Sequence, residues 1–158
     1  MAPNLTQLKQ IKALLQELLE KMGVTADIAT HVGEEHIFVD MSNVTPDPKV
    51  IIGQNGDTLL ALQLVLSLIA GKKAGLESKL VLDVDAYRAK REQSLVALAK
   101  RLAAQVEETG QKVILDPLRP FERRIVHMTL QKEFPHLHTE SIGEEPFRRI
   151  VITKQKPE

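Results

Sequence analysis

The sequence predicts an α+β protein made of two parts in succession. Leucine-rich segments with helical spacing alternate with short β-branched segments, and no internal repeat or low-complexity tract interrupts this order. The 158 residues are 43% hydrophobic, which is enough for a real core. A small sheet covered by helices is therefore expected in the first part, and a second small α+β unit after it.

The first part is expected to begin with a helix followed by two strands. Apolar residues at three- and four-residue spacing predict an amphipathic helix over residues 5–22, which Gly23 ends. Two alternating or β-branched segments follow, over residues 25–32 and 36–41. Because a short Gly-Glu-Glu turn joins them, we expect them to form an antiparallel pair.

Two aspartates indicate the starts of the next two helices. Asp47 precedes a proline, as an N-cap residue does when proline occupies the first helical position. Asp57 follows a Gly-x-x-Gly loop and is expected to cap a strongly apolar helix. The elements expected here are a short helix over 49–52, a helix from 57 to about 70, a turn over 71–75 and a strand over 79–84.

A long helix over residues 86–109 is expected to open the second part. Its apolar stripe is predicted at Leu95, Leu98, Leu102 and Val106, and Gly110 ends it. The elements expected after it are a strand over 112–115, a helix over 121–133 and strands over 138–142 and 148–153. We place the first domain at residues 1–85 and the second at 86–156, with 86–109 as the connecting helix.

The formal charge of zero conceals an asymmetry between the two parts. Residues 1–83 contain seven lysines and ten acids, a charge of −3, whereas the remainder contains 14 basic residues and 11 acids, a charge of +3. All eight arginines lie in the second part. Since the guanidinium group binds phosphate with a planar fork, this distribution indicates an anion-binding surface there.

The first candidate site is the loop Gly53-Gln54-Asn55-Gly56, with Ile51 and Ile52 before it. Glycine has no Cβ, so a nucleic-acid backbone could approach closely, and the start of the next helix favours negative charge. A lone Gly-x-x-Gly is more often a structural turn, but the order strand, helix, Gly-x-x-Gly, helix, strand is the plan of a KH module. No lysine or arginine lies in the loop, so we expect modest RNA affinity.

The second candidate site is the pair Arg123 and His127, which one helical turn brings onto one face. The pair could donate hydrogen bonds to phosphate or sugar oxygens, although an arginine and a histidine at this spacing usually form only a solvated surface. The pair also matches the Arg-x-x-x-His pattern of the R-three-H domain. Two flanking segments make the match specific: Asp116-Pro117-Leu118-Arg119-Pro120-Phe121-Glu122 and Thr139-Glu140-Ser141-Ile142-Gly143-Glu144-Glu145-Pro146-Phe147-Arg148-Arg149.

With Tyr87-Arg88-x-Lys90-Arg91 opening the connecting helix, residues 25–153 resemble the Jag (KhpB) family of bacterial RNA-binding proteins. The resemblance implies a type II KH module of order αββααβ with a three-stranded sheet, joined to a small α+β R-three-H domain. It further implies a cytoplasmic protein that binds single-stranded RNA, as a post-transcriptional regulator or RNA chaperone linked to cell elongation or division. Single-stranded DNA is the alternative ligand, and a second KH protein or a second copy of the chain is the alternative partner.

The resemblance also implies roles for particular residues. The backbone of residues 53–56 would contact RNA, while Ile51 and Ile52 line the base groove. The residues implied in the second domain are Arg123, Arg124, His127, Arg148 and Arg149, with Tyr87, Arg88 and Arg91 as auxiliary contacts. Tyr87, the only tyrosine, would either stack on a base or pack within the protein.

Other functions are less well supported by the sequence. Absence of cysteine excludes disulfide scaffolds, thiolate zinc sites and a cysteine nucleophile. No catalytic motif, cofactor motif, secretory signal or membrane-spanning segment is visible, so we expect no enzyme, no cofactor, no metal, no membrane partner and a cytoplasmic location. An interaction adaptor whose KH half binds a protein remains the main alternative, and a metal-dependent hydrolase using His136-x-His138 or Asp83-x-Asp85 is the least favoured.

Overall fold

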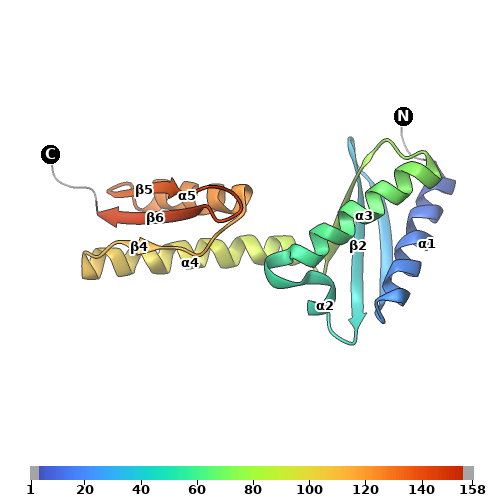
Figure 1. Cartoon of the computed structure of the whole chain (residues 1–158), viewed down its shortest axis with the longest axis horizontal. Helices are drawn as coiled ribbons and strands as arrows, with labels where there is room; N and C mark the ends of the chain where they lie inside the picture. The colour runs from blue at the N-terminus through green and yellow to red at the C-terminus, as the bar shows by residue number, and fades with distance from the viewer. Residues whose placement is uncertain (1–3, 155–158) are drawn as a thin grey trace. The chain divides into compact units, whose positions relative to one another are not determined.

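The computed structural model describes residues 4–154, so residues 1–3 and 155–156 of the predicted domains lie outside the described residues. The chain divides into two compact units, residues 1–88 and 89–158, and each is described by itself. Figure 1 shows a helix-covered sheet in the first unit and a second α+β unit beginning within the long helix.

The first unit contains the predicted αββααβ order. Its elements are α1 (Leu5–Lys21), β1 (Thr25–Val32), β2 (His36–Thr45), α2 (Lys49–Ile52), the 3-10 turn η1 (Gln54–Gly56), α3 (Asp57–Ala74) and β3 (Lys79–Val84). The sheet has the order β1-β2-β3, with an antiparallel β1/β2 pair and a parallel β2/β3 pair. The α+β prediction for this part is confirmed.

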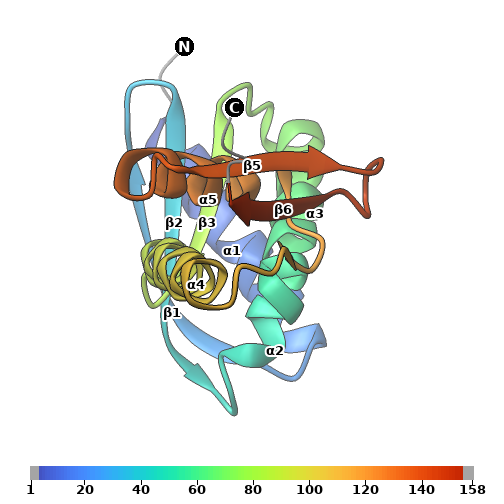
Figure 2. The same ribbon diagram turned by 90° about the vertical axis from the view of Figure 1, so that its left-hand side faces the viewer.

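One face of the sheet carries the core of the first unit. Side chains alternate along β2 and β3, so that Ile37, Val39 and Met41 are buried beside Leu80 and Leu82. Helices α1 and α3 contact each other and cover this face of the sheet (Figure 2). The alternate side chains of β2, such as Phe38 and Asp40, are only half-buried on the other face, as expected of a sheet with helices on one side.

Two details of α3 differ from the sequence-based prediction. The helix continues through Gly71 to Ala74, and the chain turns at Gly75, whose φ is +59°. The helix thus extends one turn beyond its predicted end, because Gly71 is tolerated in a helix packed against α1. Asp57 is the first helical residue and not the cap; the N-cap is Gly56, in the left-handed conformation.

The second unit contains α4 (Tyr87–Thr109), β4 (Val113–Ile114), α5 (Pro120–Glu133), β5 (Leu137–Ile142) and β6 (Arg149–Lys154). Its strands form an antiparallel sheet in the order β4-β6-β5. The first two residues of α4 belong to the first unit, and the rest of the helix belongs to the second. All predicted elements of this part are present.

The second core lies where α4, α5 and the sheet meet. The predicted stripe of α4 is partly wrong, because the fully buried positions are Leu95, Ala99, Ala103 and Val106. Leu98 and Leu102 are half-buried beside this core. Small alanine side chains let other elements approach the helix closely, so alanine rather than leucine occupies the centre of this packed face.

Among residues 4–154, no helix is both long enough and apolar enough to cross a bilayer.

Candidate nucleic-acid interface

The loop over residues 53–56 has a backbone conformation that residues other than glycine rarely adopt. Gly53, Asn55 and Gly56 all have positive φ, at +70°, +51° and +83°. A Cβ on Gly53 would lie 2.1 Å from Oγ1 and 2.8 Å from the backbone nitrogen of Thr58. Glycine is therefore required at position 53 by the fold itself, whether or not RNA binds there.

The side chains around this loop divide into exposed and buried groups. Gln54 and Asn55 are exposed, and Ile52 is half-buried. Ile51, by contrast, is fully buried in the core of the first unit. Its predicted place in the base groove is therefore wrong, because a helix of one turn directs one of two consecutive isoleucines inward.

Tyr87 and Arg88 connect the start of α4 to this unit. A Cβ on Gly56 would lie 2.8 Å from the Tyr87 ring, and this ring packs against the first core. The Arg88 guanidinium donates from Nε to the Leu82 carbonyl (3.0 Å) and from Nη2 to Gln63 Oε1 (2.9 Å). These contacts give both residues a structural role beside the Gly-x-x-Gly loop.

Arg123 is engaged within the second unit. Its side chain is 10% exposed, donates from Nη1 to the Leu118 carbonyl (2.6 Å), and forms a two-pronged ion pair with the Glu145 carboxylate. Glu145 lies in the loop between β5 and β6, so the pair fastens this loop to α5. A bidentate arginine–carboxylate pair uses the same donors that a phosphate would need.

His127 is held from the neighbouring strand. Thr139 Oγ1 on β5 lies 2.6 Å from His127 Nδ1, and the ring is otherwise exposed. Because Nδ1 is occupied by the threonine hydroxyl, Nε2 remains to contact a ligand. The structure thus orients the histidine from a residue twelve positions away, which no local spacing in the sequence indicated.

The arginines of the second part fall into two groups. Arg88, Arg91 and Arg123 have partners within the protein, and Arg119 also makes an interaction. The exposed arginines for which the described residues provide no partner are Arg101, Arg124, Arg148 and Arg149. Three of the four, Arg124, Arg148 and Arg149, are sequence-predicted site residues, and they retain all their donors for an anion.

Glu122 anchors the start of α5. It is only 1% exposed, and its carboxylate accepts from Arg91 Nε (2.8 Å) and from the backbone N–H of Arg119 (3.1 Å). Arg91 is consequently a structural partner of α5 rather than a free auxiliary contact. The Asp-Pro-Leu-Arg-Pro-Phe-Glu segment therefore serves to position the helix that carries Arg123 and His127.

Other polar groups weighed in the sequence have local roles. Asp83 Oδ1 accepts from the backbone N–H groups of Val84 (2.9 Å) and Arg88 (3.3 Å), as a residue capping α4 would. His136 pairs through Nε2 with Glu107. Within residues 4–154, no group of three or more acidic or histidine side chains is placed to hold a metal ion.

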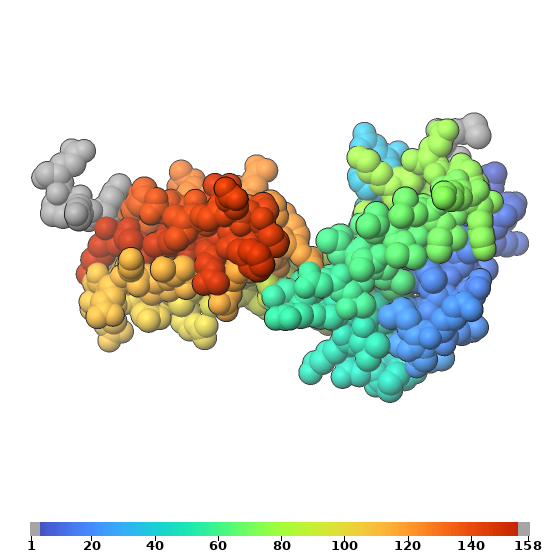
Figure 3. All heavy atoms as spheres, viewed as in Figure 1, coloured from blue at the N-terminus to red at the C-terminus, as the bar shows by residue number. Residues whose placement is uncertain are grey.

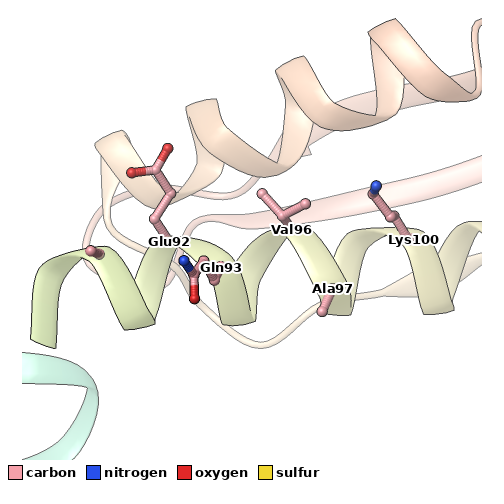
Figure 4. Close-up of a pocket in the computed structure, with 6 residues that line it drawn as sticks. Glu92, Gln93, Val96, Ala97 and Lys100 are labelled. Atoms are coloured by element: carbon pink, nitrogen blue, oxygen red, sulfur yellow. The ribbon is translucent and has the colours of Figure 1, made fainter.

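A shallow pocket lies along α4 of the second unit. Figure 4 shows Glu92, Val96 and Lys100 pointing toward the neighbouring helix, with Gln93 and Ala97 beside them. Lys100 is neutralised by Glu133 at 2.8 Å. None of the predicted site residues lines this pocket, so it is not part of the candidate interface.

Comparison with known proteins gives consistent results for this chain. The R-three-H domain, named for the Arg-x-x-x-His pattern, matches residues 93–154. RNA-binding protein KhpB of Clostridium symbiosum is 34% identical over 142 residues, covering 90% of this chain. The chain belongs to the Jag (KhpB) family. KhpB of Lactiplantibacillus plantarum is 32% identical over 98% of the chain, and KhpB of Bacillus subtilis is 29% identical over 94%.

The family members are longer than this chain. The chain spans 64% of the length of the C. symbiosum protein, 47% of the L. plantarum protein and 71% of the B. subtilis protein. The Arg123/His127 helix and both strands of the β5–β6 hairpin lie within the segment that matches the R-three-H domain. Sequence reasoning found the KhpB pattern but missed Glu122, Thr139 and Glu145, whose roles depend on contacts across the fold.

Proposed function

We propose that this protein is a non-enzymatic single-stranded RNA-binding protein that uses the Gly53–Gly56 loop and the second unit. The names of its KhpB relatives support this interpretation, as does the match to the R-three-H domain. A role as post-transcriptional regulator or RNA chaperone linked to cell elongation or division belongs to the same proposal, with single-stranded DNA as the alternative ligand. The cytoplasmic location stays a prediction.

The observation that carries the proposal is the set of arginines in the second unit for which residues 4–154 provide no partner. Arg124 lies one turn from His127 on α5, and Arg148 and Arg149 lie at the start of β6. We call these four residues the arginine surface. The Arg123–Glu145 pair joins α5 to the loop that leads into β6. Arg123 is therefore proposed to be a positioning residue, while the arginine surface contacts phosphate and sugar.

Replacing Arg148 and Arg149 together by glutamine should weaken RNA binding and reduce its salt dependence. Each lost phosphate contact on a single strand reduces the magnitude of the slope of log K against log salt by about 0.7. The slope of the double variant should therefore be smaller in magnitude by about 1.4 than that of the wild type. Fluorescence anisotropy of a labelled unstructured RNA at several salt concentrations measures this. Arg101→Gln is the matched control, since Arg101 is exposed and has no partner among residues 4–154 but lies outside the proposed surface. An equal loss in the control would contradict the assignment.

Adding a cation to the Gly-x-x-Gly loop should strengthen binding. Gln54 is exposed, and its φ is not among the positive values of the loop, so Gln54→Lys fits the backbone. The new charge should raise affinity at low salt and increase the salt slope by about 0.7. Gln54→Glu should do the reverse in the same titration. If neither variant changes binding, the loop does not contact RNA in this protein.

The adaptor hypothesis is favoured by one feature of the first unit. Helix α3 exposes Leu60, Leu64 and Leu68 at four-residue spacing, with Val65 beside them. An exposed apolar stripe of this kind is typical of a protein contact, and a second copy of the chain supplies the same stripe. Light scattering at increasing protein concentration tests this. A mass that doubles in the wild type and not in Leu64→Glu supports self-association through this stripe. A constant single-chain mass excludes self-association and leaves a different protein as the partner in the adaptor hypothesis.

A further inference from the structure

The loop between β5 and β6 presents an aromatic ring to solvent. Phe147 is 71% exposed, the highest fraction for any large hydrophobic side chain among residues 4–154. Figure 3 shows the atoms of this hairpin, drawn in red, at the surface of the second unit. Leaving a phenylalanine ring in water forgoes about 2 kcal/mol of burial free energy. An exposed ring at this position is therefore available to bind a ligand.

The loop that carries Phe147 is held in place from both sides. The Phe147 N–H donates to the Glu144 carbonyl (2.9 Å), and the Leu118 N–H donates to the Arg148 carbonyl (3.4 Å). The Arg123–Glu145 ion pair fastens the same loop to α5, and strand pairing resumes directly at Ile142 and Arg149. The ring is thus presented on a fixed backbone, which lowers the conformational entropy lost when a ligand binds.

The charge around the ring favours an anionic ligand. Glu145 is neutralised by Arg123, which leaves Glu144 as the one unpaired carboxylate among residues 143–149. Arg148 and Arg149 follow Phe147 directly, and both are exposed without a partner in the described part of the chain. A flat apolar face beside two free guanidinium groups combines a stacking surface with phosphate donors.

We propose that Phe147 is a base-stacking residue, on which an unpaired nucleobase of a single strand stacks while Arg148 and Arg149 bind the adjacent phosphates. This deepens the proposed function and rests on it. Bases in a duplex are already stacked on each other, so the site selects single strands. The π-face of every base is available, so the contact tolerates sequence variation. A protein anchor is less favoured, because two arginines follow the ring directly and charged residues are depleted at the core of protein interfaces.

A tryptophan at this position reports stacking directly. The chain contains no tryptophan, so Phe147→Trp has a single emitting indole. Titration with an unstructured RNA oligonucleotide should quench its fluorescence, and a duplex of the same sequence should not. Leu5→Trp is the matched control, because Leu5 is 69% exposed and lies in the first unit. Equal quenching in the two variants, or none at position 147 while the oligonucleotide binds, would overturn the proposal.

Affinity measurements distinguish stacking on an aromatic ring from a purely hydrophobic contact at position 147. Phe147→Leu removes the π-face and should weaken binding about 5- to 100-fold, whereas Phe147→Tyr retains it and should bind as the wild type does. Thermal unfolding of both variants should match the wild type, because the ring is exposed. If the wild type does not bind RNA, the proposed function fails. If the wild type binds RNA and Phe147→Leu binds equally well, only the stacking inference fails. A Phe147→Leu variant that changes self-association but not RNA affinity would contradict the stacking inference in the same way.

Discussion

Glu122→Ala is expected to lower the free energy of unfolding of the second unit by about 3 kcal/mol, a decrease in melting temperature on the order of 10–20 °C. The carboxylate is buried and accepts from Arg91 on α4 and from the backbone N–H of Arg119, the residue that caps the start of α5. Removing it leaves a guanidinium facing a cavity and an unsatisfied amide. Because Arg91 retains some access to water, the loss should be at the lower end of the range for a broken buried pair.

The matched control for Glu122 lies on the same helix. Glu133→Ala breaks the Lys100–Glu133 pair, in which both side chains are well exposed. Exposed ion pairs contribute less than about 1 kcal/mol, so this variant should melt close to the wild type. Thermal unfolding followed by circular dichroism compares the two. Equal effects would show that Glu122 is not the anchor that positions α5.

Gly53→Ala is expected to destabilise the first unit by about 2–4 kcal/mol. Two causes combine at this residue. Its φ of +70° with ψ of −171° is a conformation essentially restricted to glycine, and a Cβ would overlap both the side chain and the backbone nitrogen of Thr58. The side chain can rotate but the backbone of α3 cannot move away, so strain remains. Denaturant unfolding of the full chain measures the change.

Gly71→Ala provides a control for which the opposite change, an increase in the free energy of unfolding, is expected. Gly71 lies inside α3, and a Cβ there would meet only the Leu76 carbonyl at an ordinary 3.7 Å. Alanine is a better helix former than glycine, so this variant should gain about 0.5–1 kcal/mol. Destabilisation by both substitutions would contradict the assigned helix boundary. Because Gly53→Ala is expected to destabilise the fold, a loss of RNA binding in that variant would not by itself show a contact with RNA. Gln54→Lys fits the backbone and therefore tests RNA binding alone.

The order and type of the elements could be predicted because each has a local cause. Helical spacing of leucines, β-branched alternation and glycines at helix ends all act over a few residues, and the bounds of β1, α2 and β3 agree with the prediction. Local patterns were insufficient at α3, where packing against α1 carries the helix past Gly71. They also misplaced the stripe of α4, because burial there depends on how closely other elements approach.

The candidate site was predictable in its motifs but not in its contacts. The Arg-x-x-x-His pattern and the arginine-rich second half are visible in the chain alone, and the family follows from them. The sequence alone does not show which of Arg123, Arg124 and Arg148 has a partner within the protein. Folding engages the first with Glu145, 22 residues away, and gives the other two no partner in the described part of the chain.

Local pattern therefore accounts for the two α+β parts, the Gly-x-x-Gly loop and the division of charge into −3 and +3. Long-range packing accounts for which groups remain available: Ile51 is buried, Thr139 holds His127, and Phe147 is exposed. The reason is physical. Backbone preferences act between neighbours in the chain, whereas burial and ion pairing depend on residues that meet only after the strands and helices have packed.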